Sequence, residues 1–156
     1  MPREKSDEWG TPQELFDHYH RQYHFTLDVA ASAALGKCKR YCSREEDGLK
    51  QGWTGAVRMN PPYSNVPAWC KKALDSARSG AVVVSLFLSF TDMIWFHDYV
   101  SHAHIELLTG RLQFVGGDRY APFATMIAVS QQRSARRGNQ LSIKISSHRT
   151  GNRRLG

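Results

Sequence analysis

The run from Ala81 to Leu88 contains three consecutive valines and almost no polar residue. Because apolar side chains fall on both alternating faces of such a run, it is typical of a central strand covered on both sides. Apolar residues at helical spacing precede it, from Pro67 to Ala77, and follow it, from Ile94 to Tyr99. Strands that alternate with helices indicate an α/β fold with a mostly parallel sheet.

Further elements extend this pattern toward both ends of the chain. Thr11-Pro12-Gln13-Glu14 has the form of a capping box with proline at the first helical position, which predicts a helix from about Pro12 to Tyr23. Thr91-Asp92 is a second capping signal, before the helix that contains Ile94. Strands are expected at 25–29, 40–42, 56–59 and 104–108, and an antiparallel terminal pair at 111–114 and 123–129.

Length and composition favour a single domain. The chain has 156 residues, of which 41% are hydrophobic and 22% charged, as in globular rather than disordered proteins. No apolar run approaches the ~18 residues that a membrane span requires, and the polar start Met1–Lys5 does not resemble a signal peptide. We therefore expect a cytoplasmic protein with no membrane partner.

The cysteines indicate reduced thiols rather than a disulfide framework, because there are three of them in a chain of medium length. Cys38 and Cys42 lack a second Cys/His pair at the spacing of a zinc site. Three histidines in and beside the first predicted helix lie on different faces of it. The sequence predicts no metal site.

The formal net charge of +7 is confined to the end of the chain. Residues 1–130 balance, and residues 131–156 contain no acidic residue but seven basic ones: Arg133, Arg136, Arg137, Lys144, Arg149, Arg153 and Arg154. Such tails bind phosphate backbones without reading sequence; a solubilising terminus is the alternative. We expect a catalytic domain over 1–130 and a basic C-terminal tail over 131–156, in which the alternation of Leu141–Ile145 is compatible with a short edge strand.

Asn60-Pro61-Pro62-Tyr63 follows the expected strand 56–59. Ligands of open α/β sheets bind beyond the carboxyl ends of the strands. Two adjacent prolines remove two backbone donors, so that the turn presents carbonyl oxygens and the Asn60 side chain, which suits an amino group. Tyr63 adds a flat ring on which a base can stack. An ordinary proline turn with a half-buried tyrosine is the alternative.

Several motifs together resemble the phage-type (Dam-like) DNA N6-adenine methyltransferases. They are Asp7-x-Trp9-x-Thr11-Pro12, Leu27-Asp28-Val29-Ala30-Ala31, Asp47-Gly48-Leu49 and Asn60-Pro61-Pro62-Tyr63-Ser64 with Trp69 following. The resemblance covers roughly Asp7 to Val129. The resemblance implies a Rossmann-like fold that binds S-adenosylmethionine and transfers its methyl group to adenine N6 in DNA. It also implies the host cytoplasm if the chain is phage-encoded.

The chemistry of the tetrapeptide agrees with this implication. The lone pair of the adenine amine is delocalised into the ring, which makes the amine a poor nucleophile. If the Asn60 side-chain oxygen and the Pro61 carbonyl accept its two N–H groups, the nitrogen can pyramidalise and direct its lone pair at the methyl group. Catalysis is then mainly orientation and electrostatic stabilisation, and Tyr63 stacks on a base extruded from the duplex.

The resemblance places the cofactor beside Trp9, Thr11, Pro12, Asp28, Ala30 and Asp47. Asp28 would engage the methionine ammonium, directly or through water, and the small Ala30 would let the backbone approach closely. The residues leave other roles open: a cap for Asp28, the capping box for Thr11, and a plain Asp-Gly turn for Asp47. The chain departs from the usual methyltransferase pattern because no glycine-rich turn follows Asp28; only Gly36 appears, several residues later.

Contacts to DNA are expected from loops, since the chain has no room for a separate recognition domain. The candidates are Ser64, Arg111 and Arg119, with Arg133, Arg136 and Arg137 in the tail. No obligate protein partner is evident. Two other functions remain open: methylation of another planar amine, such as an RNA base or a protein glutamine, and a catalytically silent DNA-binding protein, which the missing glycines would suit.

Overall fold

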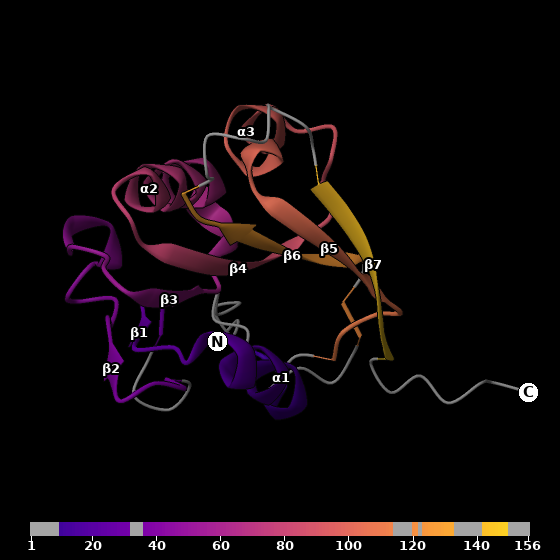
Figure 1. Ribbon diagram of the computed structural model, residues 1–156, viewed down its shortest axis with the longest axis horizontal. Coiled ribbons are helices and arrows are strands. Elements are labelled where there is room, and N and C mark those ends of the chain that lie inside the picture. Colours follow the sequence, from indigo (N-terminus) through magenta and orange to yellow (C-terminus); the bar gives the residue numbers. More distant parts are fainter. Residues whose placement is uncertain (1–9, 32–35, 114–119, 122, 133–141, 150–156) are drawn as a thin grey trace, which may run out of the picture.

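A seven-stranded sheet forms the centre of the computed structural model, with strand order β2-β1-β3-β4-β6-β5-β7 (Figure 1). The structure describes residues 10–31, 36–113, 120–121 and 123–132, and the backbone of 142–149. The strands are β1 (Leu27–Asp28), β2 (Arg40–Tyr41), β3 (Ala56–Met59), β4 (Val82–Leu88), β5 (His104–Thr109), β6 (Thr125–Ser130) and β7 (Ser142–Arg149). The helices are α1 (Gln13–Tyr23), α2 (Val66–Arg78) and α3 (Ile94–Asp98), with 3₁₀ turns η1 (Gly48–Lys50), η2 (Tyr63–Asn65) and η3 (Val100–His102).

The sheet is mostly parallel, as the sequence predicts. β1 pairs in parallel with β2 and β3, β3 with β4, and β5 with β7. β6 is antiparallel to both of its neighbours, β4 and β5. The predicted α/β class with a Rossmann-like, mostly parallel sheet and an antiparallel pair is confirmed.

The antiparallel pairing involves other strands than the expected ones. In the described part of the segment 111–114, the only pairing is an isolated bridge from Gln113 to Tyr120. β6 pairs instead with β5 and is inserted beside β4. The reason lies in burial, because every residue of β6 is buried whereas Arg111 and Gln113 are exposed. β6 therefore suits the interior of the sheet.

Helices cover the two faces of the sheet in separate layers (Figure 1). On one face, α1 packs its buried Leu15, Phe16 and Tyr19 against β4 and β6. On the other face, α2 and α3 cover a core that includes Trp69, Trp95 and the central residues of β3 and β4. None of the described helices is long and apolar enough to cross a membrane.

The two predicted capping signals do not cap their helices. Pro12 is the N-cap residue of α1 and Met93 that of α3, and neither helix has a side-chain hydrogen bond at its cap. The Thr11 side chain is buried and bonds to the sheet instead. By contrast, α2 begins with Pro67 in its first turn and ends before Gly80, whose φ is +106°, as expected.

The close contact between η1 and the end of β1 requires glycine at position 48. A Cβ atom at Gly48 would lie 1.9 Å from the carbonyl oxygen of Val29 and 3.0 Å from Cη2 of Trp69. We predict that Gly48→Ala lowers the free energy of unfolding by about 1–3 kcal/mol, the usual cost of overpacking. Gly52→Ala is the matched control, because a Cβ there meets nothing within 4 Å. Urea denaturation of both variants checks the prediction, and equal midpoints would contradict it.

Candidate active site

The candidate site lies where the chain changes direction in the sheet. β1 is followed by β2 on one side, and the chain then crosses to β3 on the other side of β1. The carboxyl ends of β1 and β3 are therefore neighbours at a topological switch point, which is where open α/β sheets bind ligands. Asp28 ends β1, and Asn60 directly follows β3.

A buried ion pair joins these two strands. Asp28 and Arg58 are register partners on β1 and β3, so their side chains project from the same face of the sheet. Arg58 Nη1 donates to Asp28 Oδ2. Asp28 has no exposed surface and Arg58 is only 7% exposed, so each charge depends on the other for compensation. Arg58 also lies over the ring of Phe16 on α1, 5.7 Å from its centroid.

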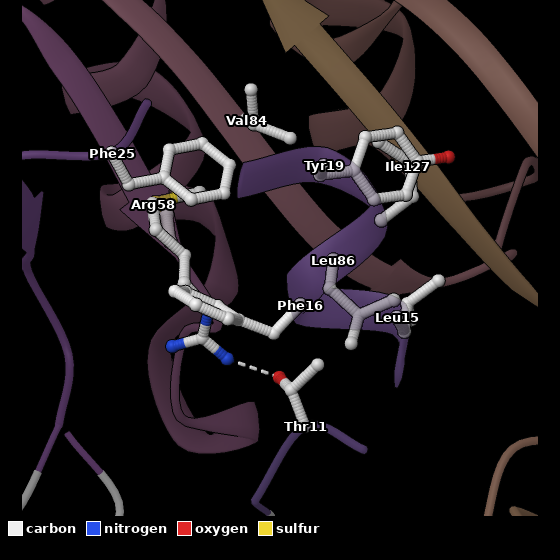
Figure 2. A pocket seen from close by; sticks show the side chains of 10 residues that line it. Thr11, Leu15, Phe16, Tyr19, Phe25, Arg58, Val84, Leu86 and Ile127 are labelled. Carbon is white, nitrogen blue, oxygen red and sulfur yellow. Dashed lines mark hydrogen bonds between the residues drawn. The ribbon is translucent and has the colours of Figure 1, made fainter. Parts of the chain in front are cut away.

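Thr11 extends this pair to the residue after β3. Arg58 Nη2 donates to Thr11 Oγ1, and Asn60 Nδ2 donates to the same oxygen at 3.3 Å. Figure 2 shows the guanidinium of Arg58 pointing at Thr11, beside the cavity beneath α1 that Leu15 and Phe16 help to line. Asp28, Arg58, Thr11 and Asn60 thus form one network built from three separate segments of the chain.

The Asn60-Pro61-Pro62-Tyr63 turn leaves β3 at this point. Pro61 is buried, and Asn60, Pro62 and Tyr63 are half-buried. The backbone N–H of Asn65 donates to the carbonyl of Pro62 at 3.5 Å, and Tyr63 begins η2. Burial raises the pKa of Tyr63 to about 12, so its ring is uncharged at neutral pH. An uncharged, partly accessible aromatic ring is suited to stacking on a base.

The residues at the end of β1 have the chemistry that binding of S-adenosylmethionine requires. Asp28 Oδ1 is buried and has no hydrogen-bond partner among the described residues, although its second oxygen is paired with Arg58. A buried acceptor without a partner is costly unless a ligand supplies a donor, and the cofactor's ammonium is such a donor. Ala30, two residues after Asp28, is half-buried and has a small side chain. These residues fit the cofactor.

Asp47 is engaged in its own turn. Its side chain accepts from the backbone N–H of Leu49 at 3.2 Å and lies 3.6 Å from Lys50 Nζ, and its φ is +50°. These contacts match the Asp-Gly turn that the sequence left open. The neighbouring Gly48 packs against Val29, so this turn borders the end of β1 without its carboxylate joining the network described above.

Three other predicted site residues are half-buried or exposed. Pro12 is half-buried at the start of α1, Ser64 is exposed in η2, and Arg111 is exposed after β5. Five further predictions fall outside the described residues: Trp9, Arg119, Arg133, Arg136 and Arg137.

Arg58 is the site residue that the sequence analysis missed. A signal for it exists, because Arg58 is the one charged residue in the otherwise apolar strand Ala56–Met59, and it comes two residues before Asn60. A charge in a buried strand needs a partner. Asp28, in the predicted strand 25–29, is an acidic candidate for that partner, and the structure puts the two residues in register.

The cysteines lie apart from this chemistry. Cys38, Cys42 and Cys70 are free thiols. Burial raises the pKa of Cys38 to about 11 and that of Cys70 to about 12, which keeps both protonated and unreactive at neutral pH. Within the described part of the chain, no three His, Cys, Asp or Glu side chains are grouped so that they could hold a metal ion.

Comparison with known proteins identifies the family of this chain. The family model of DNA N-6-adenine-methyltransferase (Dam) matches residues 1–141. The chain belongs to this family. The predicted resemblance to Dam-like methyltransferases is therefore confirmed, and the matched range includes Thr11, Asp28, Arg58 and Asn60.

Individual relatives are more distant. A DNA N-6-adenine-methyltransferase of Escherichia phage T1 is 27% identical over 129 residues, which are 80% of this chain and 54% of the relative. The chain thus spans about half the length of that curated relative. Among solved structures, a predicted O-methyltransferase from Agrobacterium tumefaciens is similar with a TM-score of 0.37 and 18% identity, over 87% of this chain and 62% of that one.

The buried ion pair gives a prediction for stability. Arg58→Met removes the partner of a fully buried carboxylate, and we expect it to lower the free energy of unfolding by about 3–5 kcal/mol. Lys50→Met is the matched control, because Lys50 is 81% exposed and its pairing with Asp47 is a surface contact. Chemical denaturation should show a large fall in midpoint for Arg58→Met alone. Similar midpoints for the two variants would mean that the pair is not needed.

Proposed function

We propose that this Dam-family protein transfers the methyl group of S-adenosylmethionine to N6 of adenine in DNA. The observation that carries the proposal is the network from Asp28 through Arg58 and Thr11 to Asn60. It brings the carboxylate of Asp28 and the amide of Asn60 to adjacent strand ends in a member of the family.

On the target side, Asn60 and Pro61 would receive the adenine amine. The Asn60 Oδ1 atom and the Pro61 carbonyl oxygen are acceptors, and each would take one N–H of the amine. Both N–H groups would then be held while the nitrogen lone pair turns toward the methyl group. The site would contribute orientation and stabilisation of the positive charge that develops on nitrogen, with no strong base required at the start.

The target base must leave the duplex to reach this turn. Tyr63 lies three residues after Asn60 and is half-buried, and burial raises its pKa to about 12, so that its ring is uncharged at neutral pH. We propose that this ring stacks on the extruded adenine, while Pro61 and Pro62 hold the turn rigid.

On the cofactor side, Asp28 Oδ1 would accept from the methionine ammonium. Trp9, Pro12 and Ala30 would enclose the cofactor together with the backbone of Thr11, whose hydroxyl is engaged by Arg58 and Asn60, and the turn at Asp47 would border it. The bound cofactor supplies an electrophilic methyl group on a sulfonium. The protein's part is to hold the carboxylate of Asp28 ready, and the Arg58 guanidinium does so by compensating its charge inside the protein.

We propose contacts to DNA for Ser64 and Arg111 at this edge of the sheet, and for four further arginines of the chain. Ser64 lies one residue after Tyr63, and Arg111 follows β5, whose carboxyl end is on the same edge as that of β4. Arg119, Arg133, Arg136 and Arg137 would add phosphate contacts. Work on DNA would locate the protein in the cytoplasm, that of the host if it is phage-encoded. The proposed domain boundary near Gln131 directly follows β6, and β7 lies within the basic segment after it.

Asn60→Ala tests the proposed chemistry. The variant loses the side-chain acceptor for the adenine amine, and we expect methyl transfer to DNA to fall by about 100-fold or more. Binding of S-adenosylmethionine, measured by calorimetry, should stay close to that of the wild type because Asn60 is on the target side. A variant with wild-type turnover would show that the proposed role of Asn60 is wrong.

The basic tail generates a separate prediction about salt. Replacement of Arg133, Arg136 and Arg137 by alanine should weaken DNA binding and reduce the slope of log K against log[salt] by about 0.9 for each phosphate that the variant no longer neutralises. Substitution is preferable to truncation after Gln131, which would also remove β7 from the sheet. Arg78→Ala is the control, because Arg78 is exposed at the end of α2 near the opposite edge. An unchanged slope in the triple variant would contradict the assignment.

A further inference from the structure

The Thr11 hydroxyl contacts both halves of the candidate site. It accepts a hydrogen bond from Arg58 Nη2, whose guanidinium is paired with Asp28, and another from Asn60 Nδ2 at 3.3 Å. Thr11 is only 4% exposed and does not cap α1, the local role that its sequence suggests. A buried hydroxyl placed between two donors has a function other than starting a helix.

We propose that Arg58 and Thr11 are positioning residues that set the orientation of the Asn60 amide. This inference rests on the proposed function. An asparagine amide has two donors on its nitrogen and an acceptor on its oxygen. Because Nδ2 donates to Thr11 Oγ1, the nitrogen end of the amide faces Thr11. Of the two ends of the amide only Oδ1 can accept from the adenine amine, because a reversed amide would present N–H groups to N–H groups.

The oxygen of Thr11 is itself held in place by Arg58. A guanidinium has donors and no acceptor, so Thr11 must act as acceptor toward it. The guanidinium is fixed in turn by the buried carboxylate of Asp28 and by the ring of Phe16, 5.7 Å away. Its planar fork serves Asp28 and Thr11 with separate nitrogens, an arrangement that a lysine ammonium cannot reproduce. The orientation of Asn60 thus depends on the cofactor-side carboxylate through two intervening side chains.

The proposal separates turnover from cofactor affinity. If the hydroxyl of Thr11 acts through Asn60, its loss should lower kcat at saturating S-adenosylmethionine. If it serves only the cofactor, its loss should weaken cofactor binding and leave kcat at saturation unchanged. A merely structural hydroxyl would affect neither quantity in a folded variant.

Thr11→Val tests this relay from Arg58 through Thr11 to Asn60, because valine keeps the shape of threonine without its oxygen. We expect kcat to fall about 10- to 100-fold, the range for a misplaced catalytic group, with the calorimetric Kd for S-adenosylmethionine within about twofold of the wild type. Thr11→Ser restores a hydroxyl and should recover most of the lost turnover. Thr26→Val is the matched control, since Thr26 is exposed and its hydroxyl bonds the Ala56 carbonyl outside the site.

Two results would overturn the proposal: a wild-type kcat in Thr11→Val, whether or not the Kd is weaker, or no recovery in Thr11→Ser. If Thr11→Val does not fold, Arg58→Lys replaces it, and a kcat equal to that of the wild type would equally overturn the relay. If the wild-type protein itself transfers no methyl group, the proposed function fails. Crystal structures of the Thr11→Val and Thr11→Ser variants then decide the relay: a rotated Asn60 amide in the valine variant alone supports it, and an unchanged amide in both contradicts it.

Discussion

The ion pair between Asp28 and Arg58 is the constraint on which the site depends. A carboxylate with no exposed surface needs a compensating charge inside a protein, and Arg58 supplies it at Oδ2 of Asp28. The pair forms because β1 and β3 are parallel neighbours with these two residues in register. A shift of one residue would send one of the two charges to the opposite face of the sheet. The pair therefore specifies the register of the two strands that form the edge of the site.

The position of α1 is the second requirement, because Thr11 precedes this helix and reaches Arg58 only if the helix lies correctly. Three apolar side chains pack α1 onto the sheet, and the hydroxyl of Tyr19 donates to Glu106 Oε2 on β5 at 2.6 Å. Both residues are buried, and burial, reinforced by Glu106, raises the pKa of Tyr19 so that it remains a donor. The helix that follows Thr11 is thus anchored to β5 through Tyr19, while Thr11 itself is bonded to Arg58 on β3.

Local sequence patterns were sufficient to predict the elements that depend on neighbouring residues alone. The valine run forms β4, Pro67 lies in the first turn of α2, and the turn at Asn60 follows a strand. Patterns that depend on a distant partner were not sufficient. Thr11 has the local form of a cap, but the Arg58 guanidinium and the Asn60 amide, both far along the chain, compete for its hydroxyl. The pairing of β6 with β4 and β5 likewise reflects burial across the sheet, which short-range alternation does not encode.

The central claim is that this arrangement methylates adenine in DNA. The most direct measurement is to incubate the protein with isotopically labelled S-adenosylmethionine and unmethylated double-stranded DNA, digest the DNA to nucleosides and identify the labelled product by mass spectrometry. The network at Asn60 predicts label on N6 of adenine. Label that appears only in RNA or protein substrates offered in parallel, or in no substrate although the cofactor binds, would contradict the claim.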